Sequence, residues 1–231
     1  MFPLKDDVPG RTTPFITVGL IALNVLVFLY QLSLGIEGQR AGHAARELIM
    51  EFGLVPCRLI GHCADGLPGL PAPWLTIFTS MFLHGGIFHV GGNMLYLWIF
   101  GDNVEDTLGH GRFLVFYLLS GVAAALVQTM VSPASAIPMV GASGAVSGIL
   151  GAYLVLFPTA RVLTLVFLVF FIRVISFPAI IILGFWFLLQ LLEIGPVAAG
   201  GVAVLAHIGG FVAGAALIAA FRRRRPRQSL F

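Results

Sequence analysis

Apolar residues fall into six long runs along the chain, separated by shorter stretches that carry most of the charged side chains. A helix needs roughly 20 apolar residues to cross a ~30 Å hydrocarbon core at a rise of about 1.5 Å per residue. The runs approach that length, so the pattern predicts an all-α integral membrane protein, a bundle of six transmembrane helices. The expected helices lie near residues 14–34, 87–104, 113–131, 140–157, 178–194 and 203–221.

One further apolar stretch, residues 161–178, does not fit this series. Arg173 interrupts it well short of the length that a transmembrane helix needs. We therefore expect the stretch to lie at the membrane interface or to dip into the membrane without crossing it. A seventh span would also place the two ends of the chain on opposite sides of the membrane.

The composition agrees with a membrane protein. Hydrophobic residues make up 58% of the 231 positions, and charged residues make up only 10%. A soluble domain of this size needs a larger polar fraction to cover its surface. The composition therefore excludes a soluble globular protein.

The basic residues predict the orientation of the bundle. Lys and Arg collect on the cytoplasmic side of a membrane, and six helices with both chain ends inside leave only Arg40, Arg46 and Arg58 outside. The cytoplasmic set comprises Lys5, Arg11, Arg112, Arg161, Arg173, Arg222, Arg223, Arg224, Arg225 and Arg227. We expect a bacterial plasma (inner) membrane, because the sequence shows neither a long soluble domain nor a targeting presequence.

This topology divides the chain into three parts. Residues 1–13 form a cytoplasmic N-terminal tail, residues 14–221 one membrane domain, and residues 222–231 a basic cytoplasmic tail. The basic tail directly follows an expected span, so we expect it to bind anionic membrane lipid and not nucleic acid. The membrane domain contains one long outer loop, at about residues 35–86, between its first and second helices.

The outer loop contains both cysteines of the chain, Cys57 and Cys63. If the outside is oxidising, these two residues are placed to form a local disulfide. A metal site with His43 and His62 is the alternative, although the spacing matches no established zinc pattern.

Polar side chains gather at the first turns of three expected helices. The helices near 87–104, 140–157 and 203–221 all run from outside to inside in this topology, so their first turns lie at one depth. The polar residues there are His84, His89 and Asn93 in "HGGIFHVGGN", Ser143 in "GASG" and His207 in "AHIGG". Polar and ionisable groups are costly inside a membrane, so this layer indicates a functional site that opens to the outside.

Small residues predict which of these helices approach each other closely. Glycines three, four or seven positions apart mark the face along which membrane helices pack. Such stripes comprise Gly144, Gly148 and Gly151 on the fourth expected helix, and Gly210 and Gly214 on the sixth. His207 lies on the second stripe, and Ser143 lies at the edge of the first. If the stripes pack together, Ser143 meets His207.

A serine beside a histidine is the simplest activated nucleophile. The imidazole accepts the hydroxyl proton as general base and later returns it to the leaving amine. Asn93, His89 and the backbone N–H groups at the start of the fourth helix are candidates to stabilise the oxyanion of a tetrahedral intermediate. No acidic residue lies near His207 in the expected topology, so we expect a dyad and not a triad.

The chain closely resembles the rhomboid family of intramembrane serine proteases. "HGGIFHVGGN" matches the family pattern H-x4-H-x3-N, "GASG" matches G-x-S-G, and "AHIGG" matches A-H-x-G-G. The order and helix placement of the motifs also match. The resemblance implies a six-transmembrane-helix rhomboid-like bundle that hydrolyses peptide bonds in or beside transmembrane segments of single-pass membrane protein substrates.

The resemblance implies that the site needs no metal and no organic cofactor. It also implies roles for individual residues. Ser143 would be the nucleophile and His207 the base, with His89, Asn93 and the Ser143 backbone N–H as the oxyanion hole. His84 would order the outer loop by hydrogen bonding. The further motif residues, expected to support the site, are Gly141, Gly144, Ser147 and Gly210.

Ser147 departs from the pattern of some family members, which carry a tyrosine four residues after the nucleophile that stacks on the catalytic histidine. Serine has no ring to stack. We therefore expect another group to orient His207, and the Ser147 hydroxyl is a candidate.

Two other classes of function share these features. A non-catalytic relative would bind membrane helices without cutting them, and a small polytopic transporter would line a pathway with His, Asn and Ser side chains. A serine among glycines in a membrane helix is also commonly a packing residue. A helix-binding relative would normally lack the nucleophile or the base, and a transporter should continue its polar path to the cytoplasmic side.

Overall fold

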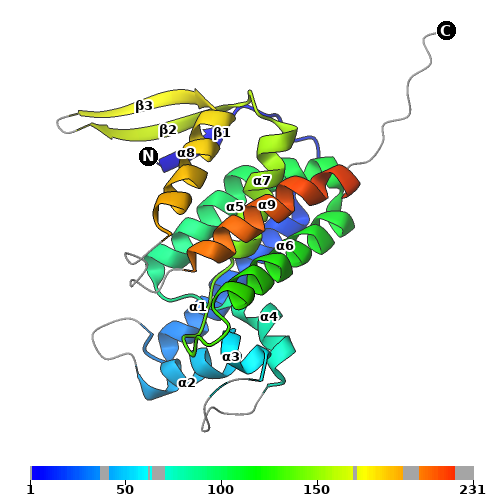
Figure 1. Cartoon of the computed structure of the whole chain (residues 1–231). Helices are drawn as coiled ribbons and strands as arrows, with labels where there is room; N and C mark the ends of the chain where they lie inside the picture. The colour runs from blue at the N-terminus through cyan, green and yellow to red at the C-terminus, as the bar shows by residue number, and fades with distance from the viewer. Residues whose placement is uncertain are drawn as a thin grey trace.

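A computed structural model of the chain describes residues 2–36, 42–61, 63, 71–168, 171–194 and 203–221. Its main body is a bundle of long helices (Figure 1). These helices are α1 (Phe15–Ser33), α5 (Ile87–Leu108), α6 (His110–Val131), α7 (Ser143–Leu156), α8 (Ala179–Leu192) and α9 (Val204–Phe221). Each one coincides with a predicted apolar run, which confirms the sequence-based placement of the helices.

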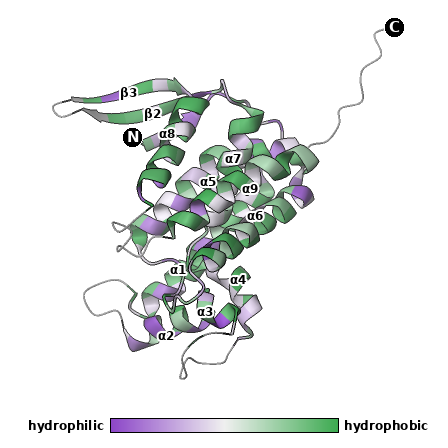
Figure 2. Cartoon of the chain, in the orientation of Figure 1, coloured by the Kyte–Doolittle hydropathy of each residue, from purple (hydrophilic) through white to green (hydrophobic). Residues whose placement is uncertain are grey.

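Three of the long helices are long and apolar enough to cross a membrane by themselves: α1, α6 and α9, with 19, 22 and 18 residues. α7 and α8 are equally apolar but have 14 residues each. α5 has 22 residues, but its last turns carry Asp102, Glu105 and Asp106. Figure 2 shows hydrophobic residues over most of the bundle helices. The chain is a membrane protein with apolar helices.

The outer loop contains short helices that cover one end of the bundle (Figure 1). These are α2 (His43–Phe52), α3 (Pro56–Leu59) and α4 (Thr76–Thr79), with 3-10 turns at Pro73–Leu75 and Ser80–Phe82. The loop is tied to the segment that leads into α7. Leu54 and Met139 exchange backbone hydrogen bonds of 3.0 and 2.7 Å, and the Cys57 N–H donates to the Ser135 carbonyl at 3.0 Å.

A three-stranded antiparallel sheet at the opposite end of the bundle corrects the all-α prediction. The strand order is β1 (Phe2–Asp6), β2 (Arg161–Leu168), β3 (Phe171–Pro178). Along β2, Val162, Thr164 and Val166 are buried while Leu163 is exposed. This alternation and the β-branched side chains favour a strand. The prediction for this stretch relies on its length and hydrophobicity, which do not distinguish a strand from a short helix.

The sheet includes part of the predicted N-terminal tail, because β1 pairs with β2. Asp6 at the end of β1 accepts a hydrogen bond from the Tyr153 hydroxyl on α7 and another, 2.8 Å long, from the Asn103 amide on α5. Burial raises the pKa of Asp6 above its ordinary value. The N-terminal segment is therefore attached to two helices of the bundle. The predicted basic tail, residues 222–231, lies outside the described residues.

A buried carboxylate fixes the start of α1. Glu105 of α5 is completely buried, and it accepts hydrogen bonds from the backbone N–H groups of Ile16 and Thr17 at 2.9 and 2.8 Å. The N–H groups of a first helical turn have no partner within the helix, and the helix dipole favours a negative charge there. His110 Nδ1 lies 2.6 Å from the same carboxylate. Glu105 thus joins α1, α5 and the start of α6.

The glycine stripe on α9 packs against the backbone of α7. A side chain at Gly210 would collide with the backbone carbonyl of Gly144, and one at Gly214 with the backbone of Gly148. On α7, a side chain at Gly151 would collide with the backbone of Phe211, whereas side chains at Gly144 and Gly148 would first meet Ala124 and Ser120 of α6. The two helix backbones are therefore in contact over two turns, a packing that only glycine allows.

We predict that Gly214→Ala destabilises the protein by at least about 1–3 kcal/mol, because the added methyl group meets backbone atoms that have no space to move. Thermal unfolding of the purified protein in detergent measures the effect. Gly19→Ala in α1 is the matched control, since a side chain there meets nothing within 4 Å. Equal stability of the two variants would contradict the role assigned to the glycine contact.

Candidate active site

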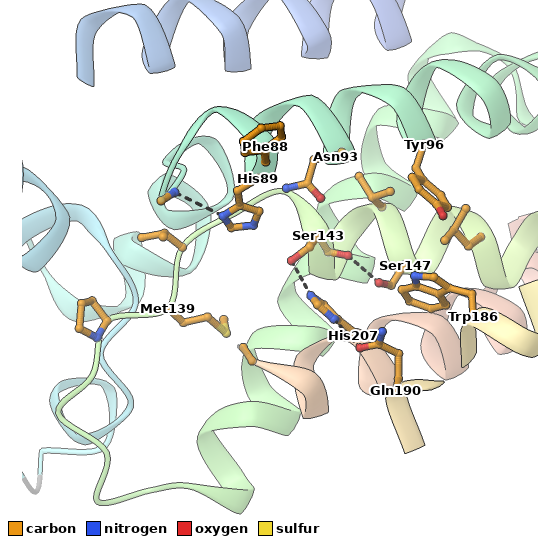
Figure 3. A pocket seen from close by; sticks show the side chains of 17 residues that line it. Phe88, His89, Asn93, Tyr96, Met139, Ser143, Ser147, Trp186, Gln190 and His207 are labelled. Atoms are coloured by element: carbon orange, nitrogen blue, oxygen red, sulfur yellow. Dashed lines mark hydrogen bonds between the residues drawn. The ribbon is translucent and has the colours of Figure 1, made fainter. Parts of the chain in front are cut away.

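A cavity of about 440 Å³ lies where the first turns of α5, α7 and α9 converge, with α8 along one side (Figure 3). Its polar lining comprises His89, Asn93, Ser143, Ser147, Gln190 and His207. The remaining lining is largely apolar and includes Phe88, Trp186 and Leu150. Three helices thus bring their polar first turns to one place, as the sequence predicts.

Ser143 and His207 form a hydrogen bond across the contact between α7 and α9. Ser143 is the first residue of α7, and its Oγ lies 2.8 Å from Nε2 of His207, in the first turn of α9. The Gly144–Gly210 contact lies directly after Ser143 on α7 and about one turn after His207 on α9, so the closeness of the backbones limits the distance between the two side chains. A serine in this arrangement can pass its proton to the imidazole.

The segment before Ser143 requires glycine at one position. Gly141 has φ +125°, a region that other residues rarely adopt. A side chain there would also lie 2.7 Å from Nε2 of His89. The Gly141 N–H donates to the Ser80 carbonyl at 2.8 Å, and the Gly85 N–H donates to Nδ1 of His89 at 3.3 Å. Gly141 thus lets the chain pass directly beside His89.

Asn93 offers a hydrogen-bond donor in the cavity. Its side chain is 8% exposed, and its Nδ2 has no hydrogen-bond partner among the described residues. Buried donors without partners are rare in proteins. Asn93 lies one helical turn after His89, and both side chains lie beside Ser143 (Figure 3). The cavity therefore presents donors next to a candidate nucleophile.

Comparison with known proteins shows the family of this chain. The model of the rhomboid domain matches residues 71–224, which contain all of these site residues. The chain belongs to the rhomboid family. Rhomboid protease GluP from Bacillus subtilis (strain 168) is 35% identical over 208 residues, which cover 88% of this chain and 35% of that protein.

Two further relatives come from eukaryotes. Rhomboid protein 1, mitochondrial, from Saccharomyces cerevisiae is 37% identical over 97 residues, 40% of this chain and 28% of that protein. RHOMBOID-like protein 1 from Arabidopsis thaliana is 41% identical over 78 residues, 34% of this chain and 20% of that protein. The matched part of this chain thus spans about a third or less of the length of these three relatives.

The structure corrects the expectation that the Ser147 hydroxyl is a candidate to orient His207. The Ser147 hydroxyl donates to the Ser143 carbonyl at 2.6 Å, a bond within α7 that serines in helices commonly make. The partner of His207 is Gln190 of α8, whose Oε1 lies 2.8 Å from Nδ1 of the ring. Sequence reasoning missed Gln190. The one signal was a lone amide in the apolar run of α8, and nothing in the run indicated which neighbour it faces.

His84, the first histidine of the rhomboid motif, is completely buried, and neither of its ring nitrogens has a hydrogen-bond partner among the described residues, so the expected hydrogen bonding of this ring to the loop is not seen. Its ring packs edge to face against His89, with 5.1 Å between ring centroids. The Gln31 side chain of α1 holds the His84 backbone in place. Gln31 Oε1 accepts from the His84 N–H at 2.9 Å, and Gln31 Nε2 donates to the His84 carbonyl at 3.0 Å. Gln31 is a second residue whose role the sequence did not reveal.

The outer loop contains a disulfide between Cys57 and Cys63. Of the two arrangements that the sequence allowed, the structure therefore has the disulfide and not the metal site. His62, the other proposed ligand between the two cysteines, lies outside the described residues. Together with the bonds to Ser135 and Met139, the bridge stabilises the loop where it adjoins the segment leading to Ser143.

We predict that Gln31→Leu destabilises the protein by about 1–3 kcal/mol for each buried backbone group of His84 that loses its partner. The backbone amides of residues 80–86 should also exchange faster with deuterium, which mass spectrometry measures. Gln128→Leu is the control, because the side-chain oxygen of Gln128 has no hydrogen-bond partner in the described part of the chain. Unchanged exchange in residues 80–86 of Gln31→Leu would contradict the prediction.

Proposed function

We propose that this chain is an intramembrane serine endopeptidase that hydrolyses peptide bonds in or beside transmembrane segments of single-pass membrane proteins. The observation that carries the proposal is the 2.8 Å hydrogen bond between Ser143 Oγ and His207 Nε2, in a cavity within the apolar bundle. Membership in a family that includes a rhomboid protease 35% identical to this chain supports it.

The reaction follows from the two side chains. His207 Nε2 takes the proton of Ser143 as its Oγ attacks the carbonyl carbon of the substrate peptide bond. The C–N bond then breaks, and His207 gives the proton to the departing amine. An ester between Ser143 and the substrate remains. A water molecule, losing a proton to His207, attacks this ester. The C–O bond to Ser143 then breaks, His207 returns the proton to Ser143 Oγ, and the second product leaves.

The oxyanion of each tetrahedral intermediate needs hydrogen-bond donors. Asn93 Nδ2 is a buried donor without a partner among the described residues, and the His89 ring lies beside it. The backbone N–H of Ser143 is in the first turn of α7, where N–H groups have no partner within the helix. We assign these three groups to the oxyanion hole. They act in an environment of low polarity, where such donors contribute most.

The same proposal places the site in the membrane. All six long helices cross it, with both ends of the chain in the cytoplasm and the cavity open to the outside. The 14 residues of α7 cover roughly 21 Å, less than the ~30 Å hydrocarbon core, so α7 begins below the outer surface. Some relatives in the family are named as mitochondrial. For this chain we propose a bacterial plasma membrane, because the relative from Bacillus subtilis matches 88% of it.

The cavity does not support the transporter alternative. Leu97, Phe100 and Ile149 are completely buried in the bundle. Phe100 packs edge to face on Tyr153, which bonds the distant Asp6. Apolar side chains therefore separate the cavity from the polar groups near the sheet. A helix-binding relative without activity is disfavoured because the serine and the histidine are both present and in contact.

We predict that the purified protein in lipid vesicles cleaves a single-pass substrate that has small residues near its outer membrane boundary. Ser143→Ala and His207→Ala should each abolish cleavage, because each removes one half of the dyad, while thermal unfolding stays near that of the native chain. Gel analysis of the products measures the rate. Cleavage by Ser143→Ala at the native rate would return Ser143 to a packing role, and solute flux through the vesicles would favour the transporter.

We further predict that Asn93→Ala lowers kcat about 10²- to 10³-fold, the usual effect of removing one oxyanion donor. The same vesicle assay measures the rate. Asn24→Ala is the control, because the Asn24 amide is buried but donates within α1, to the Leu20 carbonyl at 2.8 Å. A loss of activity no larger than that of the control would remove Asn93 from the oxyanion hole.

A further inference from the structure

The histidine of the dyad is held from two sides. Its Nε2 faces Ser143 Oγ at 2.8 Å, and its Nδ1 faces Gln190 Oε1 at 2.8 Å (Figure 3). Gln190 is 9% exposed and lies in the last turn and a half of α8. Trp186, one turn earlier on the same helix, places its ring 6.1 Å from the His207 ring. A third helix thus contributes directly to the orientation of His207.

The chemistry of an amide oxygen determines what this contact does. An amide oxygen only accepts hydrogen bonds, so the bond to Gln190 requires a proton on Nδ1 of His207. A neutral imidazole carries one proton, and Nε2 is then left with a lone pair facing the Ser143 hydroxyl. This is the tautomer that a general base for Ser143 needs. The Gln190 contact favours it before any substrate is bound.

Other candidates for this role are occupied or distant. The Ser147 hydroxyl bonds the Ser143 carbonyl, and Gln190 is the hydrogen-bond partner of Nδ1 in the described part of the chain. Trp186 contacts the ring with its planes tilted by 39°, an arrangement that limits rotation but selects no tautomer. An uncharged amide also avoids the cost that an ionised side chain at this position would have inside the membrane.

We propose that Gln190 is a positioning residue that orients His207 and fixes its tautomer, so that the site works as a Ser-His-Gln arrangement. This inference rests on the proposed protease function. It adds to the dyad a group from α8, a helix that none of the three sequence motifs touches. Orientation of the base therefore depends on the packing of α8 against α9 at this contact.

Two variants of nearly equal size separate hydrogen bonding from packing. Gln190→Met removes the acceptor, and Gln190→Glu keeps an oxygen in its place. In the vesicle assay we expect Gln190→Met to lower kcat on the order of 10- to 100-fold, part of the 10²- to 10⁴-fold that a positioned base contributes. KM should stay within about twofold, because methionine fills nearly the same volume in the cavity wall and the lost hydrogen bond is made to His207. Gln190→Glu should recover most of the lost rate.

A second measurement does not depend on cleavage. Nitrogen NMR of protein labelled with ¹⁵N-histidine, with His207→Ala used to assign the signal, reports which ring nitrogen carries the proton. The native chain should show His207 protonated at Nδ1, and Gln190→Met should show a mixture of tautomers. A native His207 protonated at Nε2, or a Gln190→Met variant with native kcat and native tautomer, would overturn the proposal.

The two hypotheses fail in different ways. If the native chain cleaves and Ser143→Ala does not, the protease function stands whatever the Gln190 variants do. If Gln190→Glu recovers none of the rate that Gln190→Met loses, while both variants keep the thermal stability of the native chain, a hydrogen-bond acceptor at this position does not support the base and the positioning role is overturned. If no chain cleaves any substrate, the NMR signal of His207 still decides whether Gln190 selects the tautomer.

Discussion

The hydrogen bond between Ser143 and His207 depends on the close approach of α7 and α9. Side chains at Gly151, Gly210 and Gly214 would strike the backbone of the opposing helix, so glycine at these positions allows the approach. The hydrogen bond lies at the end of this contact where both helices begin. A wider spacing of the two helices would move the hydroxyl away from the imidazole and change the cavity beside them.

Several buried polar groups tie the bundle together. Glu105 accepts the free N–H groups of α1, and Asp6 accepts from two helices. Gln31 pairs fully with the backbone of His84. Other buried polar atoms have no partner among the described residues, such as the Ser120 hydroxyl, the Gln128 side-chain oxygen and the Asn93 amide nitrogen, and of these three residues Asn93 lines the cavity. Unpaired buried donors cost stability, and a site that stabilises developing negative charge gives such a donor a function.

The helices and the cavity residues could be predicted from the sequence. Apolar runs report helices directly, and glycine spacing reports the contact face, so the meeting of Ser143 with His207 could be predicted from the residues alone. The sheet could not be predicted in this way. Val162, Thr164 and Val166 occupy every second position, but the run is short enough to suit several structures. Its first strand lies far from the other two in sequence, and strand pairing over such a distance leaves no local signal.

The orientation of His207 was also beyond sequence reasoning. Ser147 lies on α7, one turn after Ser143, but its hydroxyl donates to the Ser143 carbonyl within the same helix. Gln190 lies on another helix in a run of apolar residues, and only the packing of α8 on α9 brings it to the ring. Which residues of α8 face α9 depends on how each helix is rotated about its axis. A run that is apolar on all sides gives no information about that rotation.

Activation of Ser143 by His207 can be tested by mass spectrometry of the protein in lipid vesicles after treatment with a fluorophosphonate, which an activated serine attacks with loss of fluoride. We expect one phosphonate adduct on Ser143 of the native chain, and none on a His207→Ala variant that is folded to the same extent. Failure to modify Ser143, or equal modification in the two chains, would contradict this activation.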